Sequence, residues 1–414
     1  MILVERALEI VLSRVAPLPE EEIDFTEALG RILREDAAAD TDLPPFRRSA
    51  VDGFAVRASD TANVPAKLKL VGTIPAGTYP DFRIGPGEAA SIMTGAPVPE
   101  GADAVQMVEM SRESADGVVL TESVAKGQNV APRGAEVLRG EVVLKRGTRL
   151  DAAAVAVVAT IGRTRIKVGR RPTVSVAATG DELVHPAETP GPGQIRNSNG
   201  YSLLAQCRAV GIDAIFLGVA EDSEASLRAF IRKGLQSDVL LLSGGVSMGR
   251  FDLVEKVLAE LRIDVLVDAV ALKPGKPLVF GVGDGGKLVF GLPGNPVSTM
   301  VTFELFVRTA LARLEGEPNP VREILRARLL DSLANRGPRR AYLPGWLRVE
   351  EGDLVAEPIP TKGSADIVAF SKANALLIVP EDQDRLEAGE PVSVYPLDSF
   401  LHKEDRWLAE KNRD

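Results

Sequence analysis

The sequence is poor in the residues that build histidine and cysteine sites. Among its 414 residues it has one cysteine, Cys207, and two histidines, His185 and His402. One cysteine excludes an intrachain disulfide and a thiolate cage for a metal, and two histidines nearly exclude a multi-histidine zinc site or a serine–histidine triad. Acid–base and metal chemistry must therefore fall on carboxylates, lysines and backbone groups.

Excess positive charge and long apolar runs are also absent. The chain has 49 Lys and Arg against 58 Asp and Glu, a formal charge of −9, which excludes a general basic field for nucleic acid or an anionic membrane. No run approaches the roughly 18 apolar residues of a membrane span, and Glu5 and Glu9 interrupt the N-terminal apolar stretch. We expect a soluble, cytoplasmic protein that binds neither nucleic acid nor membranes and holds anionic ligands only in a local basic pocket.

The length predicts two to four domains, because a domain has roughly 100–200 residues. The N-terminal residues have helical apolar spacing that ends at Pro17, and LDAAAVAVVATIG is typical of a buried, alanine-rich helix. Between these segments, short apolar runs are broken by Gly and Pro every 8–12 residues, which predicts a β-rich module. We predict a discontinuous mixed domain at 1–43 and 139–171, and a β-rich domain at 44–138.

Strands and helices alternate in the next region, 172–316, which predicts a mostly parallel sheet with helices on both faces. A single long helix is expected for PVSTMVTFELFVRTALARL. The final region, 317–400, reads as a small β-barrel or sandwich with Glu351–Gly352–Asp353 at a hairpin tip.

Polar and glycine-rich loops follow the predicted strands of the α/β region. Ligands of open parallel sheets bind at this edge, where loops present backbone N–H groups. The loops provide carboxylates, hydroxyls, glycines and lysines, the groups that hold phosphate and, through shared phosphate oxygens, Mg²⁺. The residues are Glu182, Glu221, Ser243, Gly244, Gly245, Ser247, Asp252, Lys273, Lys276, Pro293, Gly294 and Asn295.

Each of these loops also has a structural interpretation. A glycine pair after a strand is more often a turn than a phosphate site, and a KPGK turn is often a solvated loop. Asn199 and Asn295 are placed to cap helices. PPFRRSAVDGFAV alone is typical of a hairpin, and Cys207 fits a buried helix face better than a reactive site.

The order of the motifs is more specific than any one of them. Over about residues 1–395 the chain resembles the MoeA family of molybdopterin molybdenumtransferases, whose animal relative is the C-terminal domain of gephyrin. The motifs that carry the resemblance are PPFRRSAVDGFAV, SIMTGAPVPEGADAV, GQNVAPRGAEV, ATGDEL, GQIRNSNGYSL, SGGVSMGRFD, LKPGKP and GLPGNPVSTMVTFE.

The resemblance implies both a fold and a reaction. The fold is a homodimer of α/β multidomain subunits, with a MogA-like three-layer α/β/α molybdopterin-binding domain, a β-rich domain, a discontinuous mixed domain and a C-terminal β-barrel. The reaction takes adenylylated molybdopterin and molybdate, uses Mg²⁺ or a similar divalent cation, and releases molybdenum cofactor and AMP. A MogA-type adenylyltransferase and molybdoenzymes are the implied protein partners.

The resemblance also implies roles for individual residues. In the family, the site lies between the β-rich domain of one subunit and the α/β domain of the other. The implied catalytic residues are Asp52, Thr94, Glu182, Asp252, Lys273 and Lys276. The implied substrate-binding residues are Ser243, Gly244, Gly245, Ser247, Pro293, Gly294, Asn295, Arg339 and Ser364. The implied metal ligands are Glu182, Asp252, Glu221 and Glu136.

The chain departs from the family pattern at several positions. Arg47–Arg48 stands where the family has an Asp-Asn pair, and Glu136 and Glu221 stand where it has aspartates. Ala269 replaces a lysine that some relatives carry. These departures leave an alternative of another class, in which a noncatalytic paralogue keeps the dimeric scaffold and binds proteins. A phosphate-handling enzyme that shares only the α/β fold is a further alternative, which the β-rich motifs oppose.

Overall fold

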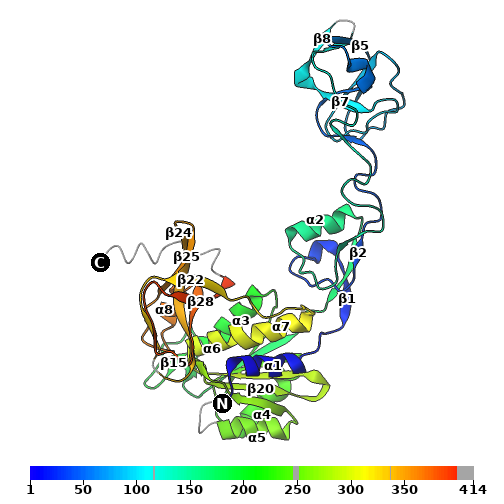
Figure 1. Cartoon of the computed structure of the whole chain (residues 1–414). Coiled ribbons are helices and arrows are strands. Elements are labelled where there is room, and N and C mark those ends of the chain that lie inside the picture. The colour runs from blue at the N-terminus through cyan, green and yellow to red at the C-terminus, as the bar shows by residue number, and fades with distance from the viewer. Residues whose placement is uncertain (115–116, 246–250, 336, 399–414) are drawn as a thin grey trace. The chain divides into compact units, whose positions relative to one another are not determined.

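The computed structural model describes residues 1–414 except 115–116, 246–250, 336 and 399–414. At residues 113, 251 and 252 it describes the backbone but not the side chain. The chain forms two compact units (Figure 1). Unit 1 comprises Met1–Glu22, Gly30–Arg34 and Lys167–Asp414, and unit 2 comprises Ile23–Leu29 and Glu35–Ile166. A two-stranded pair is formed by β1 (Glu20–Asp24) and β12 (Arg165–Gly169).

Unit 1 contains a six-stranded sheet in the order β16-β13-β17-β21-β20-β18. The first four strands are parallel, and β20 and β18 continue the sheet antiparallel. Every residue of β13, β17 and β21 is buried, as expected for apolar strands covered on both faces. The strands are β13 (Val174–Thr179), β16 (Ile215–Ala220), β17 (Val239–Ser243), β18 (Asp264–Ala269), β20 (Pro277–Val282) and β21 (Leu288–Leu292).

Helices cover both faces of this sheet, which makes the predicted three-layer arrangement. On one face, α3 contacts β13 and β16, α6 contacts β21, and α1 contacts β18. On the other face, α4 contacts β13, β16 and β17, and α5 contacts α4 and β18. Figure 1 shows α1 and α7 on the opposite side of β20 from α4 and α5. The helices are α1 (Val4–Arg14), α3 (Asn199–Ala209), α4 (Glu224–Gly234), α5 (Phe251–Glu260), α6 (Pro296–Thr302) and α7 (Arg308–Glu315).

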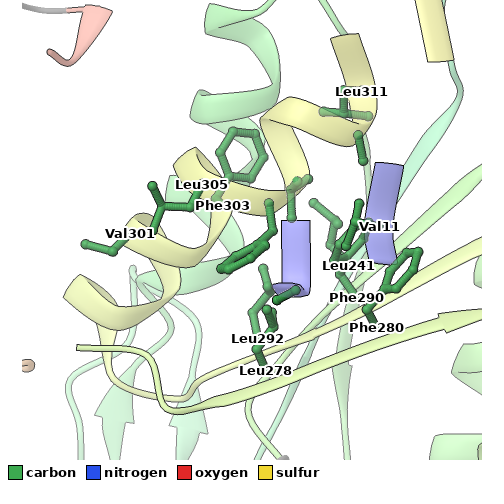
Figure 2. Close-up of a cluster of buried hydrophobic side chains, with 14 of the residues drawn as sticks. Val11, Leu241, Leu278, Phe280, Phe290, Leu292, Val301, Phe303, Leu305 and Leu311 are labelled. Atoms are coloured by element: carbon green, nitrogen blue, oxygen red, sulfur yellow. The ribbon is translucent and has the colours of Figure 1, made fainter. Parts of the chain in front are cut away.

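The long helix expected after β21 is interrupted by a different helical form. A π-helical segment, η5 (Phe303–Val307), joins α6 to α7, and all of its residues are buried. Its apolar residues enter the largest core of unit 1, where they pack with α1 and the sheet (Figure 2). In that core the rings of Phe280 and Phe290 lie 5.0 Å apart.

The C-terminal part of unit 1 is a closed five-stranded barrel rather than a sandwich. Strand β24 pairs with both β25 and β26, which closes the order β24-β25-β22-β28-β26. Glu351 and Gly352 form the predicted hairpin tip, with φ of 53° and 94°. The strands are β22 (Leu325–Leu329), β24 (Arg340–Glu350), β25 (Asp353–Pro358), β26 (Ala375–Val379) and β28 (Pro391–Pro396).

Short elements complete unit 1. Strand β19 (Leu272–Lys273) leaves the α/β layers and pairs in parallel with β24 of the barrel. The others are β14 (Leu183–Val184), β15 (Ile195–Arg196), β23 (Leu333–Ala334), β27 (Arg385–Leu386), α8 (Ile367–Lys372) and the 3₁₀ turn η4 (Asp284–Gly286).

Unit 2 is built on a six-stranded sheet in the order β7-β4-β6-β5-β9-β8, which confirms its β-rich character. The strands are β4 (Gly53–Val56), β5 (Ala66–Ile74), β6 (Glu88–Ile92), β7 (Ala104–Met107), β8 (Ser111–Ser114) and β9 (Gly117–Leu120). Two-stranded pairs are formed by β2 (Ala37–Ala38) with β11 (Val142–Leu144), and by β3 (Arg48–Ser49) with β10 (Val130–Ala131). The helices are α2 (Ala152–Thr160), η1 (Phe25–Glu27), η2 (Ala58–Thr61) and η3 (Val108–Met110).

Two local predictions in unit 2 are wrong. PPFRRSAVDGFAV is not a hairpin, because β3 pairs with β10 while β4 pairs with β6 and β7. Helix α2 forms as predicted, but only Ala154 and Val158 of it are buried. The helix packs against η1 on one side. Its other alanines and valines are partly or fully exposed within this chain.

Within the described residues, every helix lacks the length or the apolar character that a membrane crossing requires.

Candidate functional site

Three loops converge at the carboxyl edge of the unit 1 sheet. Ser243 ends β17, and the Gly244 N–H donates to the Leu292 carbonyl at the end of β21, 3.1 Å away. Gly244 and Gly245 have φ of 93° and 73°, and a Cβ on Gly244 would lie 2.6 Å from the Thr179 carbonyl oxygen. The loop after β17 therefore requires glycine both for its conformation and for its approach to the end of β13.

Asn199 links two of these loops and is not a helix cap. Its Nδ2 donates to Ser243 Oγ at 2.9 Å and to the Gly294 carbonyl at 2.7 Å. The cap position of α3 is Ser198, and the side chain that accepts from the first turn belongs to Asn197, whose Oδ1 bonds the Gly200 N–H at 3.0 Å. The predicted capping role is thus wrong, because the Asn199 amide is used across the sheet edge. Pro293, buried beside Gly294, completes this loop.

A pocket of about 800 Å³ lies in unit 1 between the KPGKP turn, the start of α6 and the barrel. It brings together five of the predicted residues that are distant in the sequence: Lys273, Lys276, Asn295, Arg339 and Ser364. The other charged residues of its lining are Lys362 and Asp331. Cationic groups therefore outnumber carboxylates there, although the chain as a whole carries −9.

The cationic side of the pocket is held by a buried asparagine. Strand β19 brings Lys273 beside β24, and Lys273 Nζ lies 3.2 Å from Asn335 Oδ1. Asn335 is fully buried, and its Nδ2 donates to the Arg339 carbonyl at 2.8 Å. Arg339 in turn donates from Nη1 to the Leu272 carbonyl at 3.0 Å. Asn335 therefore contacts the Lys273 ammonium and the backbone of Arg339, and its loop has no motif that could have marked it in the sequence.

Asn295 and Ser364 form the opposite side of the pocket. Asn295 holds the predicted cap position of α6, followed by Pro296, but its side chain makes no capping hydrogen bond. Its Nδ2 donates to Ser364 Oγ at 2.8 Å, and the Val297 N–H donates to the Ser364 carbonyl at 3.1 Å. These bonds attach the start of α6 to the segment that precedes α8.

The predicted acidic residues of unit 1 follow β13 and β16. Glu182 and Glu221 are both exposed, and their loops are joined by a hydrogen bond from the Asp222 N–H to Asp181 Oδ1, 3.0 Å long. The Glu182 carboxylate lies over Gly180, since a Cβ there would be 2.6 Å from Glu182 Oε2. Gly180 therefore leaves space for this carboxylate.

Two further predicted residues follow β17 at positions whose side chains lie outside the described part of the structure. Ser247 is among residues 246–250, and Asp252 is placed only by its backbone, as the second residue of α5. Among the residues whose side chains are described, no group of three or more His, Cys, Asp or Glu could hold a metal ion. Mg²⁺ typically takes only one or two protein carboxylates, so Glu182 and Glu221 remain suitable donors by their chemistry.

Unit 2 brings Asp52 and Thr94 together. Asp52 precedes β4 and Thr94 follows β6, and these strands pair with Gly53 opposite Ile92. The Thr94 N–H donates to Asp52 Oδ1 at 2.7 Å. A Cβ on Gly53 would lie 1.9 Å from the Gln106 carbonyl oxygen, so glycine is required beside this aspartate.

Two departures from the family pattern contact each other in unit 2. Arg48 donates from Nη2 to Glu136 Oε1 at 2.6 Å, with both side chains partly exposed. Arg47 instead donates to the Ala102 carbonyl at 2.8 Å. Glu136, predicted as a metal ligand, is thus held by an arginine.

Cys207 is buried in α3, as predicted. Burial raises the pKa of its thiol to about 12, which leaves no thiolate for chemistry near neutral pH.

Three family models match the chain in succession. They are the MoeA N-terminal region with domains I and II over residues 2–162, a probable molybdopterin binding domain over 175–313, and the MoeA C-terminal region, domain IV, over 326–397. A molybdopterin molybdenumtransferase of Staphylococcus epidermidis is 32% identical over 407 residues, 97% of each chain. One of Staphylococcus aureus is 31% identical over 410 residues, 98% of each chain.

Two crystal structures of molybdopterin biosynthesis MoeA proteins from Pyrococcus horikoshii are also similar. One has a TM-score of 0.82 at 31% identity, covering 96% of this chain and all of the other. The second has a TM-score of 0.78 at 37% identity, covering 96% of this chain and 99% of the other.

Proposed function

The chain belongs to the MoeA family, and on that basis we propose that it is a molybdopterin molybdenumtransferase of molybdenum cofactor biosynthesis. It inserts molybdate into adenylylated molybdopterin and releases AMP. The observation that carries this proposal is the basic pocket of about 800 Å³ formed by the KPGKP turn and the barrel.

Molybdate is held in this pocket by charge and hydrogen bonding. The ammonium groups of Lys273 and Lys276 and the Arg339 guanidinium compensate the oxyanion, and Asn295 and Ser364 add polar groups on the other side. Asn335 fixes Lys273 before the ligand arrives, which lowers the cost of ordering the site on binding.

The pterin substrate binds along the adjoining sheet edge. Ser243 offers a hydroxyl and Gly245 a backbone N–H group to its phosphate, and Gly244, whose own N–H bonds the Leu292 carbonyl, keeps the loop in place. Asn199 couples this loop to Gly294, next to the pocket residue Asn295. Ser247 belongs to the same loop in the sequence and is included in the proposal on that ground alone.

Mg²⁺ or a similar divalent cation accompanies the adenylylated substrate. Glu182, Glu221 and Asp252 are the residues that would hold it, together with phosphate oxygens. When bound, the cation would neutralise negative charge on the phosphoanhydride of the substrate. Glu136 of unit 2 is a further carboxylate that the family resemblance implies as a metal ligand, and its Oε1 accepts from Arg48.

Asp52 is the proposed catalytic carboxylate of unit 2. The Thr94 N–H fixes one of its oxygens and leaves the other for the substrate.

The test measures AMP release from adenylylated molybdopterin with and without molybdate and Mg²⁺. The full-length protein should release AMP in a molybdate-dependent manner, and Lys276→Gln, Asp52→Ala and Glu182→Ala should each reduce this rate by about 100-fold or more. Lys233→Gln, which removes an exposed lysine on α4, should leave the rate unchanged. Each variant is compared with the wild-type protein by circular dichroism.

Inactivity of a folded wild-type protein would refute the enzymatic function. It would favour the noncatalytic scaffold, for which Arg47 and Arg48 are the sequence argument. In the structure both arginines are used within unit 2, Arg47 on a carbonyl and Arg48 on Glu136, and the Asp52–Thr94 contact is intact.

We further propose that the protein is a cytoplasmic homodimer supplied by a MogA-type adenylyltransferase and delivering cofactor to molybdoenzymes. A mass from light scattering of twice the chain's 44.1 kDa would support the dimer, and a monomer at micromolar concentration would contradict it.

A further inference from the structure

A second pocket, within unit 2, contains none of the residues assigned above. It has a volume of about 560 Å³, within the range of roughly 300–1,000 Å³ that small-molecule sites occupy. Its walls are the segments 45–47, 97–98 and 100–102, with Tyr79, Arg83 and Arg133. A concave site of this size fits a small ligand better than a macromolecular surface.

The pocket is positively charged in an acidic chain. Three arginines line it, Arg47, Arg83 and Arg133, against the single carboxylate of Glu100. The exposed Arg83 side chain makes no hydrogen bond or ion pair with the described part of the chain. Arg133 is oriented by a 2.6 Å bond from its Nε to Asp42, which leaves its other donors for a ligand.

The pocket walls are fixed by backbone contacts. The Val98 N–H donates to the Arg47 carbonyl at 2.9 Å, and the Ile84 N–H donates to the Glu100 carbonyl at 2.8 Å. Gly101 has a φ of 87°, and a Cβ there would lie 2.1 Å from the Ile84 carbonyl oxygen. The loop can therefore approach the segment that carries Arg83 only because residue 101 is glycine.

An aromatic pair forms part of the same wall. The rings of Phe46 and Tyr79 meet edge to face, 6.5 Å apart at 86°. Tyr79 is 73% exposed, which is unusual for a large aromatic side chain and leaves its ring open for stacking. An exposed aromatic face can stack on a flat ring, and arginines beside it can bind a phosphate group that the ring carries.

We propose that this pocket binds a phosphate monoester carried on a planar ring. Arg47, Arg83 and Arg133 surround the phosphate, and the Tyr79 ring stacks on the ligand. Two kinds of ligand combine a phosphate monoester with a planar ring in this way: a nucleoside monophosphate and a phosphorylated pterin. The proposal concerns binding in unit 2 and holds whether or not the protein transfers molybdenum.

The experiment titrates AMP, a pterin monophosphate, adenosine and ribose 5-phosphate into the full-length protein by calorimetry. All titrations use a Lys276→Gln background, which weakens binding in the unit 1 pocket. The unit 1 sheet edge can still bind these ligands, so binding is assigned to the unit 2 pocket only where Arg83→Gln weakens it. AMP or the pterin monophosphate should bind saturably, and the tighter of the two identifies the source. In the same background Arg83→Gln should weaken binding by about tenfold, the loss of one charged hydrogen bond.

Two further variants separate the contributions. Tyr79→Leu should weaken AMP but not ribose 5-phosphate, because only AMP has a ring to stack. Arg163→Gln removes an exposed arginine of unit 2 outside the pocket and should have no effect. Circular dichroism verifies that each variant is folded.

Three results would overturn the proposal. They are the absence of saturable binding of both monophosphates, equal affinities of Arg83→Gln and Arg163→Gln, and adenosine binding as tightly as AMP. None of these results depends on turnover, so failure here is distinguishable from failure of the transferase assay.

Discussion

Asn335 shows how one uncharged residue can organise a charged site. It is fully buried, accepts from Lys273 and donates to the Arg339 carbonyl. Its contribution is indirect, because it holds the Lys273 ammonium and the backbone of Arg339 before an oxyanion binds. Asn335 is thus a positioning residue, and the proposed molybdate pocket depends on it.

Replacing Asn335 should weaken the binding of molybdate more than it slows the chemistry. Asn335→Leu keeps the side-chain volume but removes the acceptor for Lys273 and the donor to Arg339. We expect the KM for molybdate to rise by about tenfold, equivalent to about 1.4 kcal/mol, with a smaller change in kcat. Steady-state AMP release at varied molybdate measures both constants.

Asn374 offers a matched control for that experiment. It is equally buried, but its side chain bonds the backbone of Leu347 within the barrel, away from the pocket lining. Asn374→Leu should lower stability without changing the KM for molybdate. If both variants change the KM alike, Asn335 acts only through the stability of the barrel.

The Arg48–Glu136 contact is informative at the same scale. Both residues depart from the family pattern, and they compensate each other by forming an ion pair 88 residues apart in the sequence. Such partly exposed pairs contribute little to stability, about 0–1 kcal/mol. The pair therefore explains where Arg48 goes without assigning it a large energetic role.

At the scale of elements, Asp238 anchors the start of β17. It forms a two-bond ion pair with Arg170, 2.9 and 3.0 Å long, and accepts from the N–H and hydroxyl of Thr173, both at 2.8 Å. Burial opposes its ionisation, but these hydrogen bonds outweigh burial and lower its pKa from the usual 3.8 to about 2. The central strand β17 is therefore connected to the start of β13 through a carboxylate.

The lowered pKa predicts that Asp238→Asn destabilises the fold by an amount that depends on pH. Because the pKa is lower in the folded state, the carboxylate stabilises the fold above pH 4, and that contribution disappears as the pH falls from about 4 to 2. We expect the variant to lose about 1–3 kcal/mol at pH 7 relative to wild type. Urea unfolding between pH 7 and about pH 2 should show the two proteins converging at the acidic end.

A constant difference across that range would contradict the assignment. Asp213→Asn is the control, since Asp213 pairs with Arg208 at the surface, with side chains 87% and 82% exposed. Its effect on unfolding should be near zero at every pH.

At the scale of the whole molecule, the two units have separate apolar cores. The cores that contain Phe54 and Val105 lie entirely within unit 2, and the core around Phe280 and Phe290 lies entirely within unit 1. Because each unit has a core of its own, we expect each to have its own unfolding transition.

Phe54→Ala should affect only one of these transitions. The side chain is 1% exposed, and deleting a buried phenylalanine typically costs about 3–5 kcal/mol. In scanning calorimetry we expect one transition to shift by several degrees while the other stays in place. A single transition that moves as a whole would show that the units unfold cooperatively.

Much of this molecule follows from local sequence. Continuous apolar runs such as VSVAAT determined the buried strands, because a strand that is apolar on both faces must be covered on both. The amphipathic helices between the strands each have one apolar face to bury, and this determined the three-layer arrangement. The motif order identified the family. Patterns of this kind act over neighbouring residues, so they are readable without the fold.

Other features were decided only by tertiary structure. Barrel closure, the pocket that joins Lys273, Arg339 and Ser364, and the bond between Asp52 and Thr94 depend on segments 25 to 91 residues apart. Asn199 and Asn295 have the sequence of helix caps, yet their amides bond partners across the site. A side chain with several possible partners takes the one that folding brings within reach, and the sequence alone does not contain that distance.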